Sequence, residues 1–469
     1  MLAWPLRETT TVTETPRAAM DAARARGDLD AALRLCRDAV RARPGSAVAE
    51  HNLASVLGDM GDAGGALRAS ERALAKGGRA PETQLVRARA LQALGRFDEA
   101  EQGFVAALSA RPDYAAAHRD LAQLRWMRTA DLPHALALLE AAPATLDLAL
   151  VRSTVLQAGE RPDAAAAVLD AALQRAPAAS PLRLAAAALA AQRGQPEEQL
   201  RHATAALQAV PSDIAAARAA VEALLHAGRV GEGTALAERV VAAAPDDQGA
   251  IALLATAWRL VGDQRHAALC DDPALISTAT IAVPAGWRDL PHFLAELAAA
   301  LDPLHAWRTH PLEQSLRHGS QTQVDLTRSD VPVIRALFAA LDAPIRAHLD
   351  RLGPGSDPVR RRLTGRYRFA GAWSVRLNPG GYHRDHVHPA GWISSAFYVA
   401  LPDGARPAPE GWLSLGRPGV PTRPPLTPSR RIAPAPGMLA LFPSYLWHGT
   451  EPFGGDRPRL SVAFDLLPA

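Results

Sequence analysis

The chain has 469 residues, more than a single hydrophobic core usually organises, so two or more domains are expected. Its 51 Lys and Arg residues are nearly balanced by 48 Asp and Glu residues, which argues against the clustered basic face of a nucleic-acid-binding protein. The only cysteines, Cys36 and Cys270, exclude a disulfide framework and a zinc site built from cysteines.

The N-terminal segment, residues 1–20, is polar and rich in threonine, and we expect it to be disordered. It lacks the basic start and the apolar stretch of a secretory signal peptide. No stretch of the sequence reaches the roughly 18 apolar residues that a membrane span needs. These features predict a cytoplasmic protein that has neither a membrane nor a nucleic acid as its partner.

Residues 21–269 repeat with a period close to 34. Small residues lie 5 and 12 positions after a recurring glycine, as at Ala32 and Ala39 and at Ala164 and Ala171. Such pairs share one helix face, about two turns apart. The pattern predicts antiparallel helix pairs with a glycine in the turn and a proline after the second helix. The recurring glycines are Gly27, Gly61, Gly95, Gly159, Gly194, Gly228 and Gly262, and the prolines are Pro44, Pro112, Pro177, Pro211 and Pro245.

This pattern resembles the tetratricopeptide repeat, whose helix pairs stack into a curved solenoid with a concave surface. The resemblance implies a protein or peptide partner held in the groove, and a spacer or dimerisation arm is the alternative. One repeat, near Ala130–Ala142, lacks its glycine and is short, so we expect a kink or irregular packing there. Gly233 replaces the first alanine of the Gly228 repeat, which indicates that the repeats degrade toward their C-terminal end.

The periodicity stops after Gly262, and we place a domain boundary near residue 270, with a second domain over residues 270–469. Two amphipathic helices are expected there, over 290–302 and 331–352. The segment between these helices is polar and is expected to be extended. Within it, Gln314, Arg317 and Gln321 either line the mouth of a site or hydrogen-bond the extended segment.

Short strands are expected from about residue 367 onward, and Trp392 and Phe397 are expected in their core. Strands with dense turns and no intervening helices form sandwiches or barrels. With helices outside them, they predict a double-stranded β-helix of the jelly-roll or cupin-like kind. The expected fold class is therefore multidomain, an all-α solenoid followed by this β domain with flanking helices. The expected strands are FAGAWSVRL, GWISSAFYVAL, GWLSLG, GMLALFPSYLWHG and RLSVAFDLL, separated by turns such as NPGG and RPAPEG.

Histidines and an aspartate gather in the stretch GYHRDHVHPA, which holds His383, Asp385, His386 and His388. His448 follows 62 residues after His386. Residues at i and i+2 on a strand project to one side of the sheet, and a distant third side chain can close a facial triad around a metal. Imidazoles, with or without a carboxylate, suit Fe(II) that keeps positions open for a co-substrate and oxygen.

Three stretches resemble the 2-oxoglutarate/Fe(II) oxygenase superfamily, and especially its bacterial members that are often fused to tetratricopeptide repeats. The resemblance implies that the first stretch supplies two metal ligands and that the second supplies His448. It also implies that Arg459 and Ser461 bind the far carboxylate of 2-oxoglutarate, and that Tyr398 contacts this co-substrate. Arginine suits that role because its guanidinium donates two parallel hydrogen bonds to a carboxylate. The stretches are HVHPAGWISSAFYVALP, PAPGMLALFPSYLWHG and RPRLSVAFD, and with HPLEQSLRHGSQTQ they cover residues 305–469.

The commonest ligand motif of the superfamily is His-x-Asp, and two overlapping pairs compete for that place here. Strand parity puts His386 and His388 on one side and Asp385 on the other. The segment HVHP also lies directly before the strand GWISSAFYV, as the ligand pair does in the resembling family. We therefore predict His386, His388 and His448 as the iron ligands, with His383 and Asp385 as the alternative pair.

The resulting hypothesis is an Fe(II)/2-oxoglutarate-dependent dioxygenase that uses O2 to hydroxylate a protein or peptide held by the repeats. Two alternatives stay open at this point. One is a repeat-based protein-binding scaffold with a non-catalytic oxygenase-like fold. The other is a small-molecule oxygenase whose repeats only mediate assembly.

Overall fold

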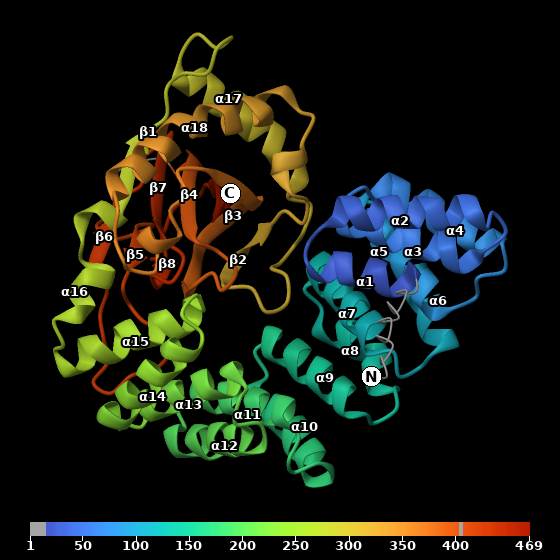
Figure 1. Ribbon diagram of the computed structural model, residues 1–469, viewed down its shortest axis with the longest axis horizontal. Helices are drawn as coiled ribbons and strands as arrows, with labels where there is room; N and C mark the ends of the chain where they lie inside the picture. Colours follow the sequence, from blue (N-terminus) through green and yellow to red (C-terminus); the bar gives the residue numbers. More distant parts are fainter. Residues whose placement is uncertain (1–15, 403–406) are drawn as a thin grey trace, which may run out of the picture. The chain divides into compact units, whose positions relative to one another are not determined.

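The computed structural model describes residues 16–402 and 407–469 (Figure 1). The predicted disordered segment, residues 1–20, lies mostly outside the described residues, and its end belongs to helix α1, Pro16–Ala25. The chain divides into two compact units, Met1–Leu121 and Ala122–Ala469. This division falls inside the helical array, within α7. The predicted boundary near residue 270 concerns a change of fold class, and it stays a prediction.

The helical array is built from successive antiparallel helix pairs. The first unit holds α1, α2 Leu29–Ala42, α3 Ala47–Asp59, α4 Ala63–Ala75, α5 Pro81–Ala93, α6 Phe97–Ala110 and the start of α7 Ala115–Thr129. The second unit continues with α8 Leu132–Glu140, α9 Leu146–Ala158, α10 Pro162–Arg175, α11 Ser180–Gln192, α12 Pro196–Ala209, α13 Ile214–His226, α14 Val230–Ala243, α15 Gln248–Val261 and α16 Arg265–Cys270. Within the described part of the chain, no helix combines the length and apolarity needed to cross a membrane.

The recurring glycine lies in the turn of every described helix pair except α7 and α8, as predicted, and in most pairs it takes a left-handed conformation. The φ angles lie between 68° and 78° at Gly27, Gly61, Gly95, Gly194, Gly228 and Gly262. In the short repeat Ala130 adopts this conformation instead, with φ 57°, and α8 has only nine residues. Gly233 does not signal weaker packing, because a Cβ atom there would lie 2.9 Å from the Leu225 side chain of the preceding helix. The glycine therefore lets α13 and α14 approach closely.

The repeat at Gly159 departs from the predicted pattern by one residue. Gly159 has an ordinary negative φ, and Glu160 takes the left-handed conformation with φ 56°. The helix that follows is shifted accordingly. The predicted small positions Ala164 and Ala171 are exposed, and Ala165 and Ala172 are the fully buried ones. The prediction of these two packing positions was therefore wrong by one residue, because the turn begins one residue later than the glycine.

The C-terminal domain is an antiparallel sheet that curls over on itself, with helices on its outside. The two predicted helices are present as α17, Leu290–Leu301, and α18, Pro332–Leu352. The strands are β1 Ser277–Thr280, β2 Leu316–Gln321, β3 Tyr367–His386, β4 Ile393–Ala400, β5 Leu413–Leu415, β6 Arg430–Ile432, β7 Met438–Pro443, β8 His448–Thr450 and β9 Arg459–Pro468. Their order is β1-β7-β4-β9-β3-β8-β5-β6, and β2 pairs with β3.

Strand β3 belongs to both halves of the curled sheet. Its first half pairs with β9, where Val375 lies opposite Ser461, and its end pairs with β8, where His386 lies opposite His448. This change of partner is the feature of a double-stranded β-helix, the predicted fold. The NPGG segment is not the expected turn between strands, because it is an irregularity inside β3 at which the pairing with β2 shifts. The expected strand GMLALFPSYLWHG is likewise split into β7 and β8.

The core of the sheet domain includes the last repeat of the array. Trp392 and Phe397, the predicted core residues, are fully buried between the sheet and the outer helices. Ile251 and Ala255 of α15 belong to the same apolar cluster. The Nε1 atom of Trp447 in the sheet domain donates a hydrogen bond to Thr256 Oγ1 over 3.0 Å. Helix α15 is thus a repeat helix on one face and part of the β-domain core on the other.

Candidate metal centre and co-substrate pocket

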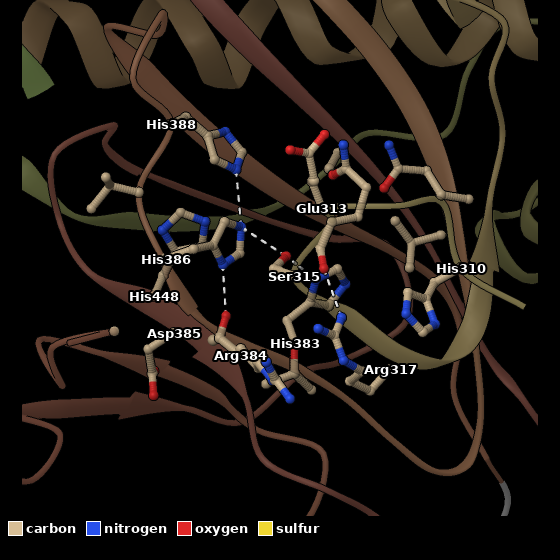
Figure 2. Close-up of a pocket in the computed structure, with 18 of the residues that line it drawn as sticks. His310, Glu313, Ser315, Arg317, His383, Arg384, Asp385, His386, His388 and His448 are labelled. Atoms are coloured by element: carbon tan, nitrogen blue, oxygen red, sulfur yellow. Dashed lines mark hydrogen bonds between the residues drawn. The ribbon is translucent and has the colours of Figure 1, made fainter. Parts of the chain in front are cut away.

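A pocket of about 860 Å³ lies within the second unit, and three histidines line it (Figure 2). His386 is the last residue of β3, His388 follows two residues later, and His448 begins β8. One nitrogen from each ring lies within 4.8 Å of the other two. The ring centroids are 4.3 Å apart for His386 and His448, and 4.9 Å apart for His388 and His448. The register between β3 and β8 thus joins residues that are far apart in the sequence.

The three rings are held in one orientation by acceptors behind them. The Nδ1 atom of His386 lies 2.8 Å from the Arg384 carbonyl oxygen, and that of His448 lies 2.9 Å from the Leu446 carbonyl oxygen. A carbonyl can only accept, so Nδ1 carries the proton and Nε2 is left as the ligand nitrogen. The Nε2 atoms of His386 and His388 are 3.2 Å apart. Either an N–H of one ring or a metal cation can lie between these two nitrogens.

Burial favours the neutral form of two of the three imidazoles, His386 and His448. It lowers the pKa of His386 to about 4, and the neighbouring His388 lowers it further. Burial likewise lowers the pKa of His448 well below its ordinary value, and the neighbouring histidines add to the effect. Neutral imidazole is the form that binds a metal, so His386 and His448 need not lose a proton at neutral pH to become ligands.

His388 is anchored by Asp465, a residue that the sequence analysis did not single out. The Asp465 Oδ1 atom lies 2.6 Å from Nδ1 of His388 and accepts a hydrogen bond from Ser394 Oγ over 2.7 Å. A carboxylate behind a ligating histidine fixes the ring and raises its basicity. The signal in the sequence was the parity of the last strand, because Arg459, Ser461 and Asp465 alternate along β9 and all line the pocket.

The alternative pair, His383 and Asp385, does not come together on one side of the strand. His383 lies near the triad, with its Nδ1 atom 3.0 Å from the Ser315 hydroxyl, which also lies 3.3 Å from His386 Nε2. The Asp385 carboxylate points away from the imidazoles (Figure 2) and forms an ion pair with Arg417. Burial raises the pKa of Asp385, and Arg417 opposes that effect. The geometry therefore favours the His386 and His388 pair.

Arg459 lies on the same inner face of the sheet as the histidines. Its side chain lines the pocket, is only 4% exposed, and donates a hydrogen bond to the Gly411 carbonyl oxygen over 2.8 Å. Ser461 follows two residues later on that face and also lines the pocket. Tyr398 pairs with Ser461 across β4 and β9, and its ring centroid lies 4.8 Å from the Arg459 guanidinium carbon. Tyr398 itself is fully buried next to Arg459. Burial raises the pKa of Tyr398 above its ordinary value, and the nearby guanidinium only partly opposes this effect.

The polar segment that ends in β2 contributes to the lining of the pocket. Gln314, Arg317 and Gln321 all line it, which agrees with the first of the two predicted roles. Arg317 also donates to the backbone oxygens of Gln314 and Leu316, over 2.7 Å each, so it serves the second role as well. Helices α9 and α11 of the array line the same pocket, a contribution that the repeat pattern did not reveal.

Residues 371–465 match the protein family described as "Putative 2OG-Fe(II) oxygenase". The match runs from β3 into β9 and contains the three clustered histidines as well as Arg459 and Ser461. The chain therefore combines an array of antiparallel helix pairs with a sheet domain that is similar to this oxygenase family over residues 371–465. A comparison with curated proteins found no match.

Several solved structures are similar to this chain in part. A tetratricopeptide repeat protein from Parabacteroides merdae is 17% identical, with 53% of this chain and 86% of that chain covered and a TM-score of 0.33. PilF of Pseudomonas aeruginosa is 19% identical, with 43% and 96% covered and a TM-score of 0.30. YrrB, described as a tetratricopeptide-repeat protein with an unusual peptide-binding site, is 18% identical, with 46% and 95% covered and a TM-score of 0.26.

Proposed function

We propose that this protein is an Fe(II)/2-oxoglutarate-dependent dioxygenase that hydroxylates a protein or peptide. The proposal is carried by three imidazoles whose nitrogens converge within 4.8 Å on the wall of a pocket that Arg459 also lines. The family match over residues 371–465 supports it. Bound Fe(II) would supply the oxidising chemistry with O2 and 2-oxoglutarate, while the protein supplies binding and orientation.

In this proposal His386, His388 and His448 hold the Fe(II). Imidazole nitrogen is a ligand that suits this metal, and three ligands on one side leave room for a co-substrate and oxygen. The residues fit the metal because each ring is neutral or anchored through Nδ1, with a nitrogen turned toward the other two. Asp465 does not bind the metal in this proposal, but its carboxylate contacts Nδ1 of the ligand His388. It thus places a negative charge beside a ligand, in place of the carboxylate that commonly binds the metal itself.

Arg459 and Ser461 bind the far carboxylate of 2-oxoglutarate in this proposal. A guanidinium and a hydroxyl on one face of β9 form a donor set that matches a carboxylate, and the buried arginine is screened from water. Tyr398 supports the guanidinium from behind through its ring face. Three neutral imidazoles leave the full charge of Fe(II) uncompensated by direct ligands, which favours a dianionic co-substrate.

We also propose a cytoplasmic location, with a protein or peptide as the partner of the repeats and no nucleic acid or membrane. The location is supported by the two cysteines of the chain, Cys36 and Cys270, which are both free thiols and buried. Proteins of oxidising compartments more often carry paired cysteines. The protein partner is supported by the helix-pair array itself, because solenoids of this kind use extended concave surfaces for binding.

The test is a titration of the purified, metal-free, full-length protein with Fe(II) under anaerobic conditions, followed by titration with 2-oxoglutarate. His388→Ala is expected to abolish tight metal binding, whereas Asp385→Ala keeps it, because that carboxylate is turned toward Arg417. Arg459→Lys is expected to keep the metal but to weaken 2-oxoglutarate binding by roughly 10- to 100-fold, since lysine lacks the planar fork.

Two results would contradict the assignment. Loss of metal in Asp385→Ala with retention in His388→Ala would restore the His383 and Asp385 pair. Absence of metal binding in the wild-type protein would leave a non-catalytic scaffold. Release of succinate from 2-oxoglutarate by the loaded wild-type protein is the expected activity, and it separates an oxygenase from a domain that merely binds the metal.

A further inference from the structure

Two helices of the repeat array form part of the wall of the candidate active site. They belong to the same compact unit as the sheet domain, residues 122–469. Apart from the adjacent Gln157 and Ala158, the contributing residues of each helix are three, four or seven positions apart, which brings their side chains onto one side of the helix. The residues are Thr154, Gln157 and Ala158 of α9 and Ala185, Ala188 and Gln192 of α11. The pocket that holds the histidine cluster is thus closed on one side by the array.

The wall repeats with the period of the array. Thr154 and Ala188 lie 34 residues apart, and so do Ala158 and Gln192. Successive repeats therefore turn equivalent positions toward the pocket. A chain lying along these faces of α9 and α11 would therefore lie in the same pocket as the histidine cluster.

The polar groups of this wall are neutral amides. The Gln192 Nε2 atom donates to Gln157 Oε1 over 3.1 Å, and Gln157 Nε2 donates to Ser153 Oγ over 3.2 Å. These two hydrogen bonds hold the amides in place and leave Gln192 Oε1 as an acceptor and further N–H groups as donors. Among the described residues that line the pocket, α9 and α11 supply no charged side chain. A wall of this kind suits a neutral ligand with alternating donors and acceptors.

The side of the pocket formed by the polar segment carries two more amides, Gln314 and Gln321. The charged Glu313 and Arg317 line this side as well, and Arg459 and Asp465 line the pocket from β9, so the uncharged wall is the one that α9 and α11 form. The pocket volume of about 860 Å³ lies near the upper end of the roughly 300–1,000 Å³ that small-molecule sites occupy. It therefore leaves space for a second ligand beside a small dicarboxylate.

We propose that Gln157 and Gln192 bind the backbone of an extended polypeptide substrate, so that the array forms one wall of the active site. The inference rests on the proposed function, because it takes the histidine cluster as the reacting centre. An amide side chain matches the N–H and C=O groups of a peptide backbone, and backbone contacts give affinity without fixing the sequence. The small side chains of Ala158, Ala185 and Ala188 leave room for substrate side chains of different sizes.

The test uses the full-length protein loaded with Fe(II) and 2-oxoglutarate, with a pool of capped random nine-residue peptides as the probe. The readouts are succinate formed above the peptide-free level and the gain of one oxygen atom by the peptides. The double variant Gln157→Leu and Gln192→Leu keeps side-chain size and helix propensity. We expect it to raise the half-saturating peptide concentration about tenfold or more, the factor that corresponds to about 1.4 kcal/mol.

Gln174→Leu is the matched control, because this exposed glutamine of α10 is not among the residues that line the pocket. We expect it to respond to peptides like the wild type. Equal peptide stimulation in the double variant and in this control would overturn the role of the amide wall. Succinate release that no peptide stimulates, but a mixture of sugars and amino acids does, would overturn the substrate class.

The affinities for Fe(II) and for 2-oxoglutarate are measured on the same samples. If the wild type binds neither, the proposed function fails, and this failure says nothing against the role of Gln157 and Gln192. If both bind and only the effect of peptides is lost in the double variant, the amide wall is the substrate-binding element. A double variant with weakened 2-oxoglutarate binding and unchanged peptide affinity would place these amides at the co-substrate instead, and would also overturn the inference.

Discussion

The helical array and the curled sheet are stabilised by contacts of opposite range. In the array each helix packs mainly on its sequence neighbours, as α3 does on α4 and α4 on α5. In the sheet the pairs join distant segments, so that Ser277 of β1 lies opposite Leu441 of β7. A fold built from contacts between sequence neighbours repeats its packing residues at a fixed spacing, so the sequence reveals it. A fold built from contacts between distant segments has no such spacing, and only the types of its residues can be interpreted. The two regions meet in α15, which serves both.

The largest effect should appear where the two regions share a core. Ile251→Ala in α15 is expected to lower the free energy of unfolding by about 2–5 kcal/mol and to loosen strands of the sheet as well. Leu85→Ala, an equally buried site in α5 of the first unit, is expected to loosen only its neighbouring helices. Hydrogen exchange of both full-length variants measures this. Unchanged protection of β4 and β7 in Ile251→Ala would show that the array and the sheet are independent.

The glycine period predicted most of the array, because a left-handed turn between antiparallel helices restricts the choice of residue directly. It failed at Gly159, where Glu160 carries the positive φ and the packing positions move by one. The period also gave no sign that α9 and α11 line the pocket, because a repeat pattern reports contacts within the array. Which helix face meets another domain depends on the three-dimensional path of the chain.

In the sheet domain the strand segments and the clustered histidines were visible in the sequence, but the partners of those histidines were not. Asp465 lies 77 residues after His388, and only the pairing of β9 with β3 and β4 brings the two together. The irregularity at NPGG was interpreted as a turn, because proline and glycine usually end a strand. The pairing of β2 with β3 on both sides of that segment keeps one long strand instead.

A second prediction concerns this long-range contact between Asp465 and His388. Asp465→Asn keeps the shape of the side chain but removes the charge, and it is expected to weaken Fe(II) binding by roughly 10- to 100-fold. Asp385→Asn is the control, because Asp385 also lines the pocket but pairs with Arg417 instead of a triad histidine. Metal titration of both variants decides the matter. Equal affinities would mean that Asp465 only completes the packing around Ser394.

A third prediction tests a short-range contact in the array, the ion pairs of Glu50. Its carboxylate is 2% exposed and accepts hydrogen bonds from Arg72 and Lys76 on the next helix, over distances of 2.7–3.0 Å. Burial opposes ionisation, but these two cations outweigh it, and the pKa of Glu50 falls below its ordinary value of 4.5. The stabilisation is therefore complete above pH 4.5 and is lost as the pH falls through the lowered pKa.

Glu50→Gln is accordingly expected to cost the first unit about 1–2 kcal/mol at neutral pH, since both partners are partly exposed and screened. The difference from the wild type should shrink as the pH falls below 4.5 and through the lowered pKa of Glu50. Hydrogen exchange in α3 and α4, measured between pH 3 and pH 7, follows it locally. A difference that stays constant over this range would assign the effect to packing and not to charge.

The smallest expected effect concerns the turn at Gly159, where the left-handed residue is not the recurring glycine. A Cβ atom on Gly159 would lie 2.5 Å from the Leu132 side chain, so this glycine serves close packing against α8 and not the backbone conformation. Glu160 instead adopts the left-handed conformation, which is strained for a residue with a side chain. Glu160→Gly should remove this strain and raise the free energy of unfolding of the second unit by about 1 kcal/mol. The same change at Glu71, in the middle of α4, should instead destabilise its helix by about 1 kcal/mol. Denaturant titration of the full-length variants compares the two signs. If Glu160→Gly destabilises the protein as Glu71→Gly does, the left-handed residue at this turn is not strained, and the one-residue shift of the repeat has no energetic cost.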